Sequence, residues 1–262
     1  FGCLKDQKFC DKMMDSILFK NLDHKYLSMK DLIGEAPEET EEEKTEDQKA
    51  ETADEKKEPE KKIIYYVTDE QQQSQYINMF KEEGIDAVIM PAAIDSPFIS
   101  HVEQKKEGLK FLRIDTDLNA AFKEEVKEDD EEFKKTSEEL TEYFKKALNN
   151  DKLDIKVEKM KNAGVASMIT ISEDTRRMQD MMKMYSMPGM DPSMFGGKGL
   201  TLVLNANNEL VKYIVDHKES ENTDLFCEQL YDLALLSHAP LTPEQMTNFI
   251  TRSNKIMELL AK

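Results

Sequence analysis

A methionine-rich stretch at residues 176–195 contains the side chains whose type and spacing best fit a binding role. It holds seven of the chain's 16 methionines. On a helix, residues three, four and seven positions apart lie on one side, so the stretch predicts one apolar face. The members of that face are Met178, Met181, Met182, Met184 and Tyr185. Methionine is flexible and polarizable, so the predicted chemistry is contact with varied apolar partners.

Prolines and glycines follow the predicted helix. Pro188, Gly189 and Pro192 would end it and leave Met187 on a flexible tether. Two other interpretations remain open. The methionines could pack as an ordinary core, although cores favour side chains with better-defined rotamers. Their thioethers could instead bind copper(I), although no His or Cys lies nearby to complete a ligand set.

Residues that usually carry catalysis show no grouping. Cys3, Cys10 and Cys227 lack C-x-x-C spacing, so we predict neither a disulfide framework nor a zinc site, and a reducing, cytoplasmic setting fits best. The four histidines are scattered: His24, His101, His217 and His238. We therefore expect no catalytic residue, no metal site and no cofactor in this chain.

Length and charge bound the remaining possibilities. The 262 residues suffice for two domains, and a first residue other than Met suggests a fragment. The formal net charge of −18 argues against nucleic acid or an anionic membrane as a partner. No apolar run approaches the length that spans a bilayer.

An acidic run at residues 35–62 separates two folded stretches. It contains 13 acidic and six basic residues with few apolar ones. Folding this run would bury too little apolar surface to offset the loss of conformational entropy. We predict that it is a disordered insertion. A functional alternative is that it acts as an entropic spacer or as a decoy for basic partners.

The fold class predicted from the pattern is mixed α/β (α+β). Residues 63–67 and 87–90 are typical of buried strands and flank a helical pattern at 74–83, which indicates a βαβ unit. The turn after the first strand, residues 68–70, is acidic and lacks a glycine-rich phosphate loop, which argues against nucleotide binding there.

The second half predicts a small sheet with helices. Strand patterns occur at residues 155–158, 165–171 and 200–204, and the methionine-rich stretch lies between the last two. We therefore expect the small sheet to present that stretch.

Two apolar helices close the chain. The first covers about residues 223–237, and the second opens with Thr242-Pro243-Glu244-Gln245, which combines an N-cap, a proline at the first helical position and a capping box. Their wide apolar faces predict either a homodimer interface or packing on the small sheet. The candidate interface residues are Leu225, Phe226, Leu230, Leu233, Leu236, Met246, Phe249, Ile250, Ile256, Met257 and Leu260.

Short motifs in order along the chain resemble the heat-shock protein 90 chaperones, most closely the bacterial HtpG type. They are FGCLKDQKF at residues 1–9, IYYVT at 64–68, GIDAV at 84–88, LYDLALLS at 230–237 and FITR at 249–252. The absence of an acidic tail after Lys262 also favours the bacterial type.

This resemblance implies that residues 1–114 end a middle domain and that residues 115–262 form the C-terminal dimerisation domain. It implies a homodimer that binds non-native client proteins through the methionine-rich helix. The site that uses ATP and Mg²⁺ would lie upstream, so this fragment would be no enzyme and hold no cofactor. An acidic-aromatic client contact is replaced here by Ser96-Pro97, which leaves Phe98 and Ile99 as substitutes.

The leading hypothesis is therefore a chaperone fragment active in protein folding and the stress response. Two rival hypotheses are a purely structural dimerisation module and a methionine-rich copper(I)-binding protein.

Overall fold

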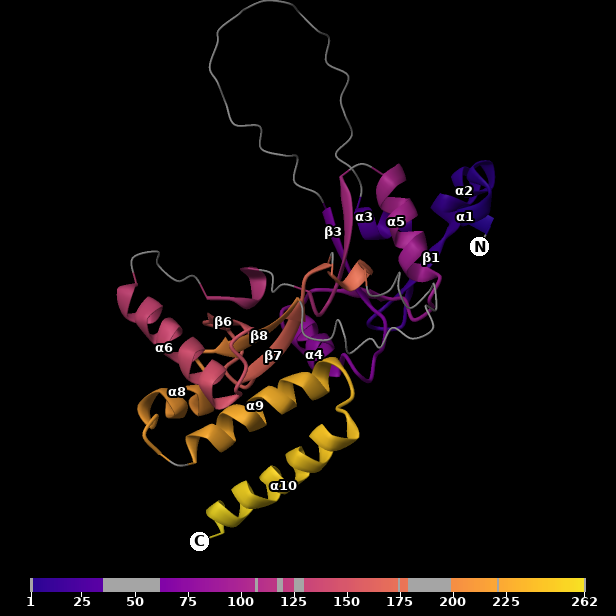
Figure 1. Ribbon diagram of the computed structural model, residues 1–262. Helices are drawn as coiled ribbons and strands as arrows, with labels where there is room; N and C mark the ends of the chain where they lie inside the picture. The colour runs from indigo at the N-terminus through magenta and orange to yellow at the C-terminus, as the bar shows by residue number, and fades with distance from the viewer. Residues whose placement is uncertain are drawn as a thin grey trace, which may run out of the picture. The chain divides into compact units, whose positions relative to one another are not determined.

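The computed structural model describes residues 2–34, 62–106, 108–116, 120–124, 130–173, 175–178, 199–220 and 222–261 (Figure 1). Most of the predicted acidic insertion, residues 35–61, lies outside the described residues. The chain divides into two compact units. Unit 1 comprises Phe1–Thr68 and Asp86–Leu112, and unit 2 comprises Asp69–Ile85 and Arg113–Lys262.

Unit 1 is built around a five-stranded sheet with the strand order β2-β1-β4-β3-β5. The strands are β1 Leu18–Asn21, β2 Tyr26–Ser28, β3 Lys62–Val67, β4 Ala87–Ile89 and β5 Leu109–Arg113. The helices are α1 Gly2–Lys5, α2 Gln7–Met13, the 3-10 turn η1 Met14–Ser16, α3 Met29–Ile33 and α5 Asp95–Lys105.

The predicted βαβ pattern is present. Strands β3 and β4 pair in parallel, with Tyr66 opposite Val88. Helix α4, Ser74–Glu82, lies between them in the sequence. Strand β1 joins the other side of β4 in the antiparallel direction, so the sheet is mixed. The mixed α/β fold class predicted from the sequence is therefore confirmed.

The core of unit 1 packs aliphatic and aromatic side chains between the sheet and its helices. Its buried members are Cys10, Met14, Phe19, Met29, Ile64, Tyr66, Val88, Met90, Ile99, Val102, Leu109 and Phe111. Phe19 lies against both Phe98 and Phe111, with ring centroids 6.4 Å apart in each pair.

Unit 2 contains a three-stranded sheet and most of the long helices. Its strands, in the order β6-β8-β7, are β6 Asp154–Glu158, β7 Ser167–Ile171 and β8 Leu200–Asn205. Besides α4, its helical elements include the 3-10 turn η2 Ala120–Phe122, α6 Glu131–Ala147, α8 Glu209–Asp216, α9 Thr223–His238 and α10 Pro243–Leu260. No helix in the described ranges is long and apolar enough to cross a membrane.

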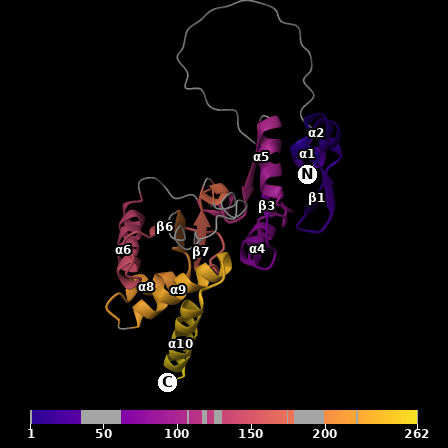
Figure 2. The same cartoon turned by 45° about the vertical axis from the view of Figure 1, so that its right-hand side comes forward.

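The central strand β8 pairs in parallel with β6 and antiparallel with β7. All five residues of β7 are buried, because α9 packs against this strand. Figures 1 and 2 show α9 lying between the sheet and α10. Helix α9 is thus a central layer of unit 2, with α10 on its outer side.

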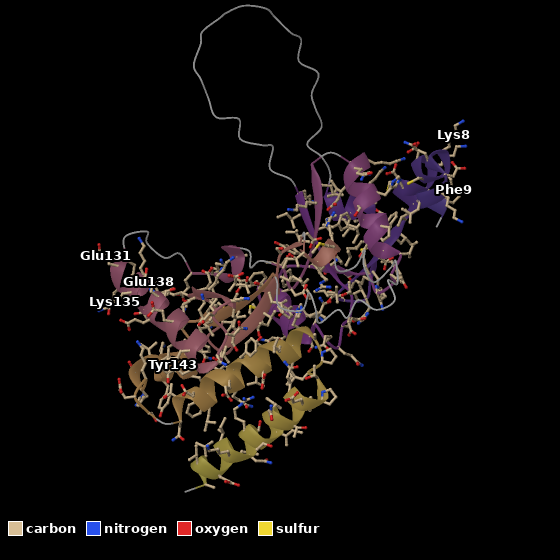
Figure 3. The ribbon with its side chains drawn as sticks, viewed as in Figure 1. Lys8, Phe9, Glu131, Lys135, Glu138 and Tyr143 are labelled. Carbon is tan, nitrogen blue, oxygen red and sulfur yellow. The ribbon has the colours of Figure 1, made fainter. Side chains whose placement is uncertain are left out.

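Helix α6 shows how the charge-rich composition is accommodated. Leu140 and Phe144 are buried in the core of unit 2, while the opposite face carries charges such as those labelled Glu131, Lys135 and Glu138 in Figure 3. Tyr143, also labelled there, donates a 2.9 Å hydrogen bond to Asp224 Oδ1 at the start of α9. This contact joins α6 to α9.

A fully buried asparagine fixes the loop that precedes β7. The Asn205 amide donates to the carbonyls of Asn162 and Val165, at 2.9 and 2.7 Å, and its oxygen accepts from Met160 N at 3.0 Å. These bonds stand in for backbone pairing that the irregular loop lacks. Asn205 therefore holds the loop against the end of β8.

Candidate functional site

The methionine-rich stretch begins directly after β7. Ser172 Oγ accepts the Thr175 backbone N–H at 3.3 Å, and residues 175–178 are helical. Met178, the first member of the predicted apolar face, is 42% exposed. Other members of the predicted binding face lie outside the described residues: Met181, Met182, Met184, Tyr185 and Met187.

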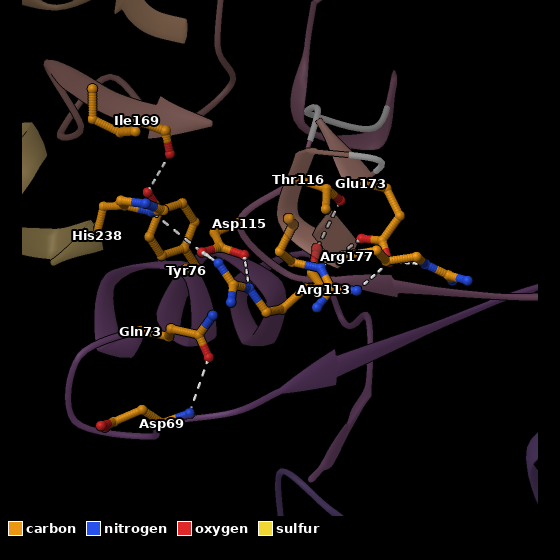
Figure 4. Close-up of polar contacts among 11 residues, drawn as sticks. Asp69, Gln73, Tyr76, Arg113, Asp115, Thr116, Ile169, Glu173, Arg177 and His238 are labelled. Carbon is orange, nitrogen blue, oxygen red and sulfur yellow. Dashed lines mark hydrogen bonds and ion pairs between the residues drawn. The ribbon is translucent and has the colours of Figure 1, made fainter. Parts of the chain in front are cut away.

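A buried ion cluster anchors this helix start. Glu173 Oε2 accepts Arg176 Nε at 3.0 Å, and its other oxygen accepts Arg177 Nε at 2.8 Å (Figure 4). Burial raises the pKa of Glu173, but the hydrogen bonds and charges of Arg176 and Arg177 outweigh burial and leave the pKa below its usual value. Arg176 is almost completely buried, although it lies in a stretch whose pattern predicts an exposed helix.

The chain returns to the same place after the stretch. Gly199 has a φ of +94°, and a Cβ atom added there would lie 2.8 Å from Thr175 Cγ2. Only glycine allows this close approach in this conformation. The described residues on the two sides of 179–198 therefore meet at Thr175 and Gly199.

A second buried network lies in unit 2 and involves residues distant in sequence (Figure 4). Asp115 accepts Arg113 Nε at 2.5 Å and Arg113 Nη2 at 2.7 Å, and its Oδ2 lies 3.3 Å from His238 Nδ1. Burial raises the pKa of Asp115, but His238 and Arg113 outweigh it and hold the pKa well below its usual value. The carboxylate is therefore ionised inside the protein.

The same network holds the ends of several elements together. The Asp115 carbonyl accepts Ile171 N at 3.2 Å at the end of β7, and His238 is the last residue of α9. Tyr76 of α4 donates a 2.5 Å hydrogen bond to the Ile169 carbonyl of β7. The strand that leads into the methionine-rich stretch is thus fixed by α4, by residues 113–116 and by the end of α9.

Helix α10 attaches to α9 through a buried arginine. Of the residues of α10, all of which the structure describes, Arg252 alone is buried. Its Nη1 donates to Glu228 at 2.5 Å, its Nε donates to Gln229 Oε1 at 3.1 Å, and its Nη2 pairs with Asp232. Gln229 also donates to Ser253 Oγ at 2.9 Å. The contact between the two helices is therefore largely polar at its centre.

Part of the apolar stripe of α10 stays exposed beside this contact. Ile250, Met257 and Leu260 are 52%, 58% and 82% exposed. Met246, Phe249 and Ile256 are partly buried. No α10 side chain, described in full from 243 to 260, joins the core of unit 2. We call the stripe formed by these six residues the α10 stripe.

The predicted interface residues of α9 divide into two groups. Leu230 is buried and Phe226 is partly buried, and both belong to the core of unit 2 or pack on it. Leu225 and Leu236 are partly buried, whereas Leu233 is exposed. Helix α9 thus uses one face for its own core and leaves Leu233 on the outside.

The remaining client candidates lie in unit 1. Ile99 is 1% exposed and belongs to the core, and Phe98 is partly buried against that core. Ile99 therefore offers no surface to a client in this structure, because it points inward from α5 to pack among aromatic side chains.

Comparison with known proteins bears on what these surfaces do. The family model described as "Hsp90 protein" matches residues 39–262. The chain belongs to the Hsp90 family. It is 31% identical over 229 residues to the chaperone protein HtpG of Bacteroides fragilis strain YCH46, covering 84% of this chain and 30% of that protein.

Other HtpG chaperones are similar over a comparable share of this chain. That of Bacteroides thetaiotaomicron is 28% identical over 228 residues, covering 84% of this chain and 30% of the relative. That of Porphyromonas gingivalis is 28% identical over 237 residues, covering 86% and 31%. The chain therefore spans 30–31% of the length of these relatives.

Sequence reasoning missed the charged residues that position these surfaces in this Hsp90 chain. The FITR motif contains Arg252 but predicts no ion pair for it, and no local pattern predicts that Asp115 and His238 lie close together. One signal was available: Glu228 and Asp232 lie four residues apart on one face of a helix, which suits a shared arginine.

We predict that Asp115→Asn lowers the free energy of unfolding by about 3 to 5 kcal/mol at pH 7, because Arg113 loses its buried partner. The lowered pKa of Asp115 gives stability that is present above the usual carboxyl pKa of about 3.9 and is lost as pH falls. The difference between the variant and the parent chain should therefore shrink below about pH 4. This difference is measured by urea unfolding between pH 3 and pH 7, with circular dichroism as the readout.

The control for this experiment is Asp151→Asn, which changes an exposed carboxylate. A destabilisation by Asp115→Asn that stays constant over the whole pH range would contradict the assignment of an ionised buried carboxylate.

We predict that Arg252→Met loosens α10, since Glu228 and Asp232 would be left without their shared cation. Amide hydrogen exchange in residues 243–260 should accelerate at least tenfold, while the β6-β8-β7 sheet keeps its protection. Lys255→Met, at an exposed position of the same helix, serves as the control. Equal protection of α10 in both variants would show that the arginine is not its anchor.

Proposed function

We propose that this chain is the part of an Hsp90-type chaperone that forms the homodimer and holds non-native client proteins. The dimer would form through the outer surface of α9 and the α10 stripe. Clients would bind the methionine-rich stretch. The relatives that are similar to this chain in sequence are named as chaperones, which supports the assignment to the chaperone class.

The observation that carries the dimer proposal is the exposure of the α10 stripe. In the part of the chain that the structure describes, α10 attaches to α9 through a buried arginine, and its Ile250, Met257 and Leu260 stay exposed. Each exposed Ile, Met or Leu that becomes buried contributes about 1.5 to 3 kcal/mol. A second copy of α10 offers a self-complementary surface, as a twofold interface requires.

We predict that Ile250→Asp together with Met257→Asp converts the dimer to a monomer, because two carboxylates would be buried in an apolar contact. The two residues are seven positions apart and so lie on one face of α10. Light scattering coupled to size-exclusion chromatography should give twice the mass of the 30.3 kDa chain for the parent and the single mass for the variant.

A matched control adds the same charge to α10 at exposed positions outside the stripe, namely Asn248→Asp with Thr251→Asp. The control should remain a dimer. If the parent chain is monomeric at all concentrations, or if the control dissociates as readily as the stripe variant, the proposed interface is wrong.

The client proposal rests on the anchored start of the methionine-rich stretch. Met178 is exposed on a helix whose base is held by Glu173 and Arg176. The rejoining chain is held at Gly199 beside Thr175. An adaptable apolar surface that is held at a fixed position can bind many clients without recognising a particular amino-acid sequence.

We predict that replacing Met181, Met182 and Met184 by Ser weakens binding of an unfolded client at least tenfold, which corresponds to about 1.4 kcal/mol. Fluorescence anisotropy of a labelled, reduced and unfolded protein measures the affinity. Met13→Ser, at an exposed methionine of α2 in unit 1, is the control and should bind as the parent does. Unchanged affinity of the triple variant would remove the stretch as the client site.

The parent chain and the triple serine variant also distinguish the chaperone proposal from the two rival functions. A structural module would bind no client, and its methionines would resist mild peroxide oxidation because they are packed. A copper(I) protein would bind one metal equivalent that the serine variant loses.

We further propose that this chain binds no ATP and acts in the cytoplasm. The acidic turn at residues 68–70 supports the first statement, because nucleotide phosphates favour glycine-rich, electropositive turns. The free thiols of all three cysteines support the second.

A further inference from the structure

Cys3 and Cys10 lie in the first two helices of unit 1, seven residues apart. On an uninterrupted helix, that separation places two residues about 10.5 Å apart along the axis. A disulfide bridges Cα atoms that are at most about 7 Å apart. A straight helix would therefore keep the two thiols from reacting with each other.

The chain breaks the helix between them. Asp6 has an extended backbone, with φ −129° and ψ 112°, and its carboxylate caps α2 by accepting the Lys8 and Phe9 N–H groups. Helix α1 consequently folds against α2. A Cβ atom added to Gly2 would lie 2.5 Å from the Phe9 ring, so α1 and α2 approach each other closely at this point. Gly2 and Phe9 directly precede Cys3 and Cys10, so this close approach brings the two cysteine-bearing segments together.

The environments of the two thiols differ. Cys10 is completely buried in the core of unit 1, whereas Cys3 packs on that core and is partly exposed. Burial raises the pKa of Cys10, and a hydrogen bond with Cys3 raises it further. Cys3 therefore lies on the solvent side of the core cluster that contains Cys10.

A groove gives small molecules access to this region. It has a volume of about 480 Å³ and is lined by Gln7, Asp11, Met14, Asp15, Lys105 and Lys106. Lys105 pairs with Asp11, and both act electrostatically on Cys10. Asp11 and Met14 follow Cys10 by one and four residues, so the groove lies beside the segment that carries this thiol.

We propose that Cys3 and Cys10 form a redox-sensitive pair that hydrogen peroxide converts to an intramolecular disulfide. The Cys3 thiolate attacks one peroxide oxygen, the O–O bond breaks, and Cys3 becomes a sulfenic acid while water leaves. The Cys10 sulfur then attacks the Cys3 sulfur, and the hydroxyl group leaves as a second water. One peroxide is reduced to two waters, and two thiols are oxidised to one disulfide.

The disulfide would lock α1 onto α2 around the break at Asp6. A low-molecular-weight thiol would reverse it by exchange. Cys227 takes no part, because it is buried in unit 2.

The experiment treats the folded chain with stoichiometric hydrogen peroxide, blocks the remaining thiols with iodoacetamide and maps tryptic peptides without reduction. Lys5 and Lys8 separate the two cysteines, so the disulfide would appear as peptide 1–5 linked to peptide 9–12. Neither peptide contains methionine, so methionine oxidation leaves the linked mass unchanged. The thiol titre should fall from three per chain to one, and dithiothreitol should restore it.

Two variants make the outcome decisive. Cys227→Ser should leave the linked peptide at its full yield, whereas Cys3→Ser should abolish it and leave Cys10 reduced. The inference is overturned if Cys3 and Cys10 both remain alkylated after peroxide treatment. It is equally overturned if peroxide links either cysteine to Cys227 or to a second chain as often as to its neighbour.

Discussion

The ion pair of Arg252 with Glu228 and Asp232 determines what the end of this chain presents to its surroundings. A helix usually attaches to its domain by burying its apolar face. Here a guanidinium buried between two acidic residues makes the attachment, and Ile250, Met257 and Leu260 are left outside. Because truncating either side would leave a buried charge without a partner, the pair fixes the orientation of α10 as well as its position. The proposed dimer surface depends on that orientation.

Charged residues play a similar part at the methionine-rich stretch. Glu173 holds two arginines at its start, and the buried Asp115 fixes the end of β7 from which it departs. These groups provide a rigid base, so a soft and adaptable apolar surface can be presented at a defined place. In both proposed surfaces of unit 2, buried ionic contacts give position, and methionine or aliphatic side chains would supply the contact area.

Local patterns predicted much of the fold. The capping box at Thr242 placed the start of α10 correctly, and the apolar run at residues 200–204 marked β8. Helix α8 and strand β2 were missed because they are short. The burial of Arg252, Arg176 and Ile99 could not be read locally, since each depends on residues brought close by the fold. Periodicity identifies an apolar face, but only the tertiary structure shows which faces stay open.

The most direct test of the account is carbene footprinting of the unmodified chain over a wide range of concentration. The account predicts that labelling of Ile250, Met257 and Leu260 falls as the chain concentration rises, while labelling of Thr251 and Glu258 on another side of α10 stays constant. Labelling of the α10 stripe that is independent of concentration, or protection confined to other surfaces, would contradict the claim that α10 turns its apolar stripe outward to meet a second copy.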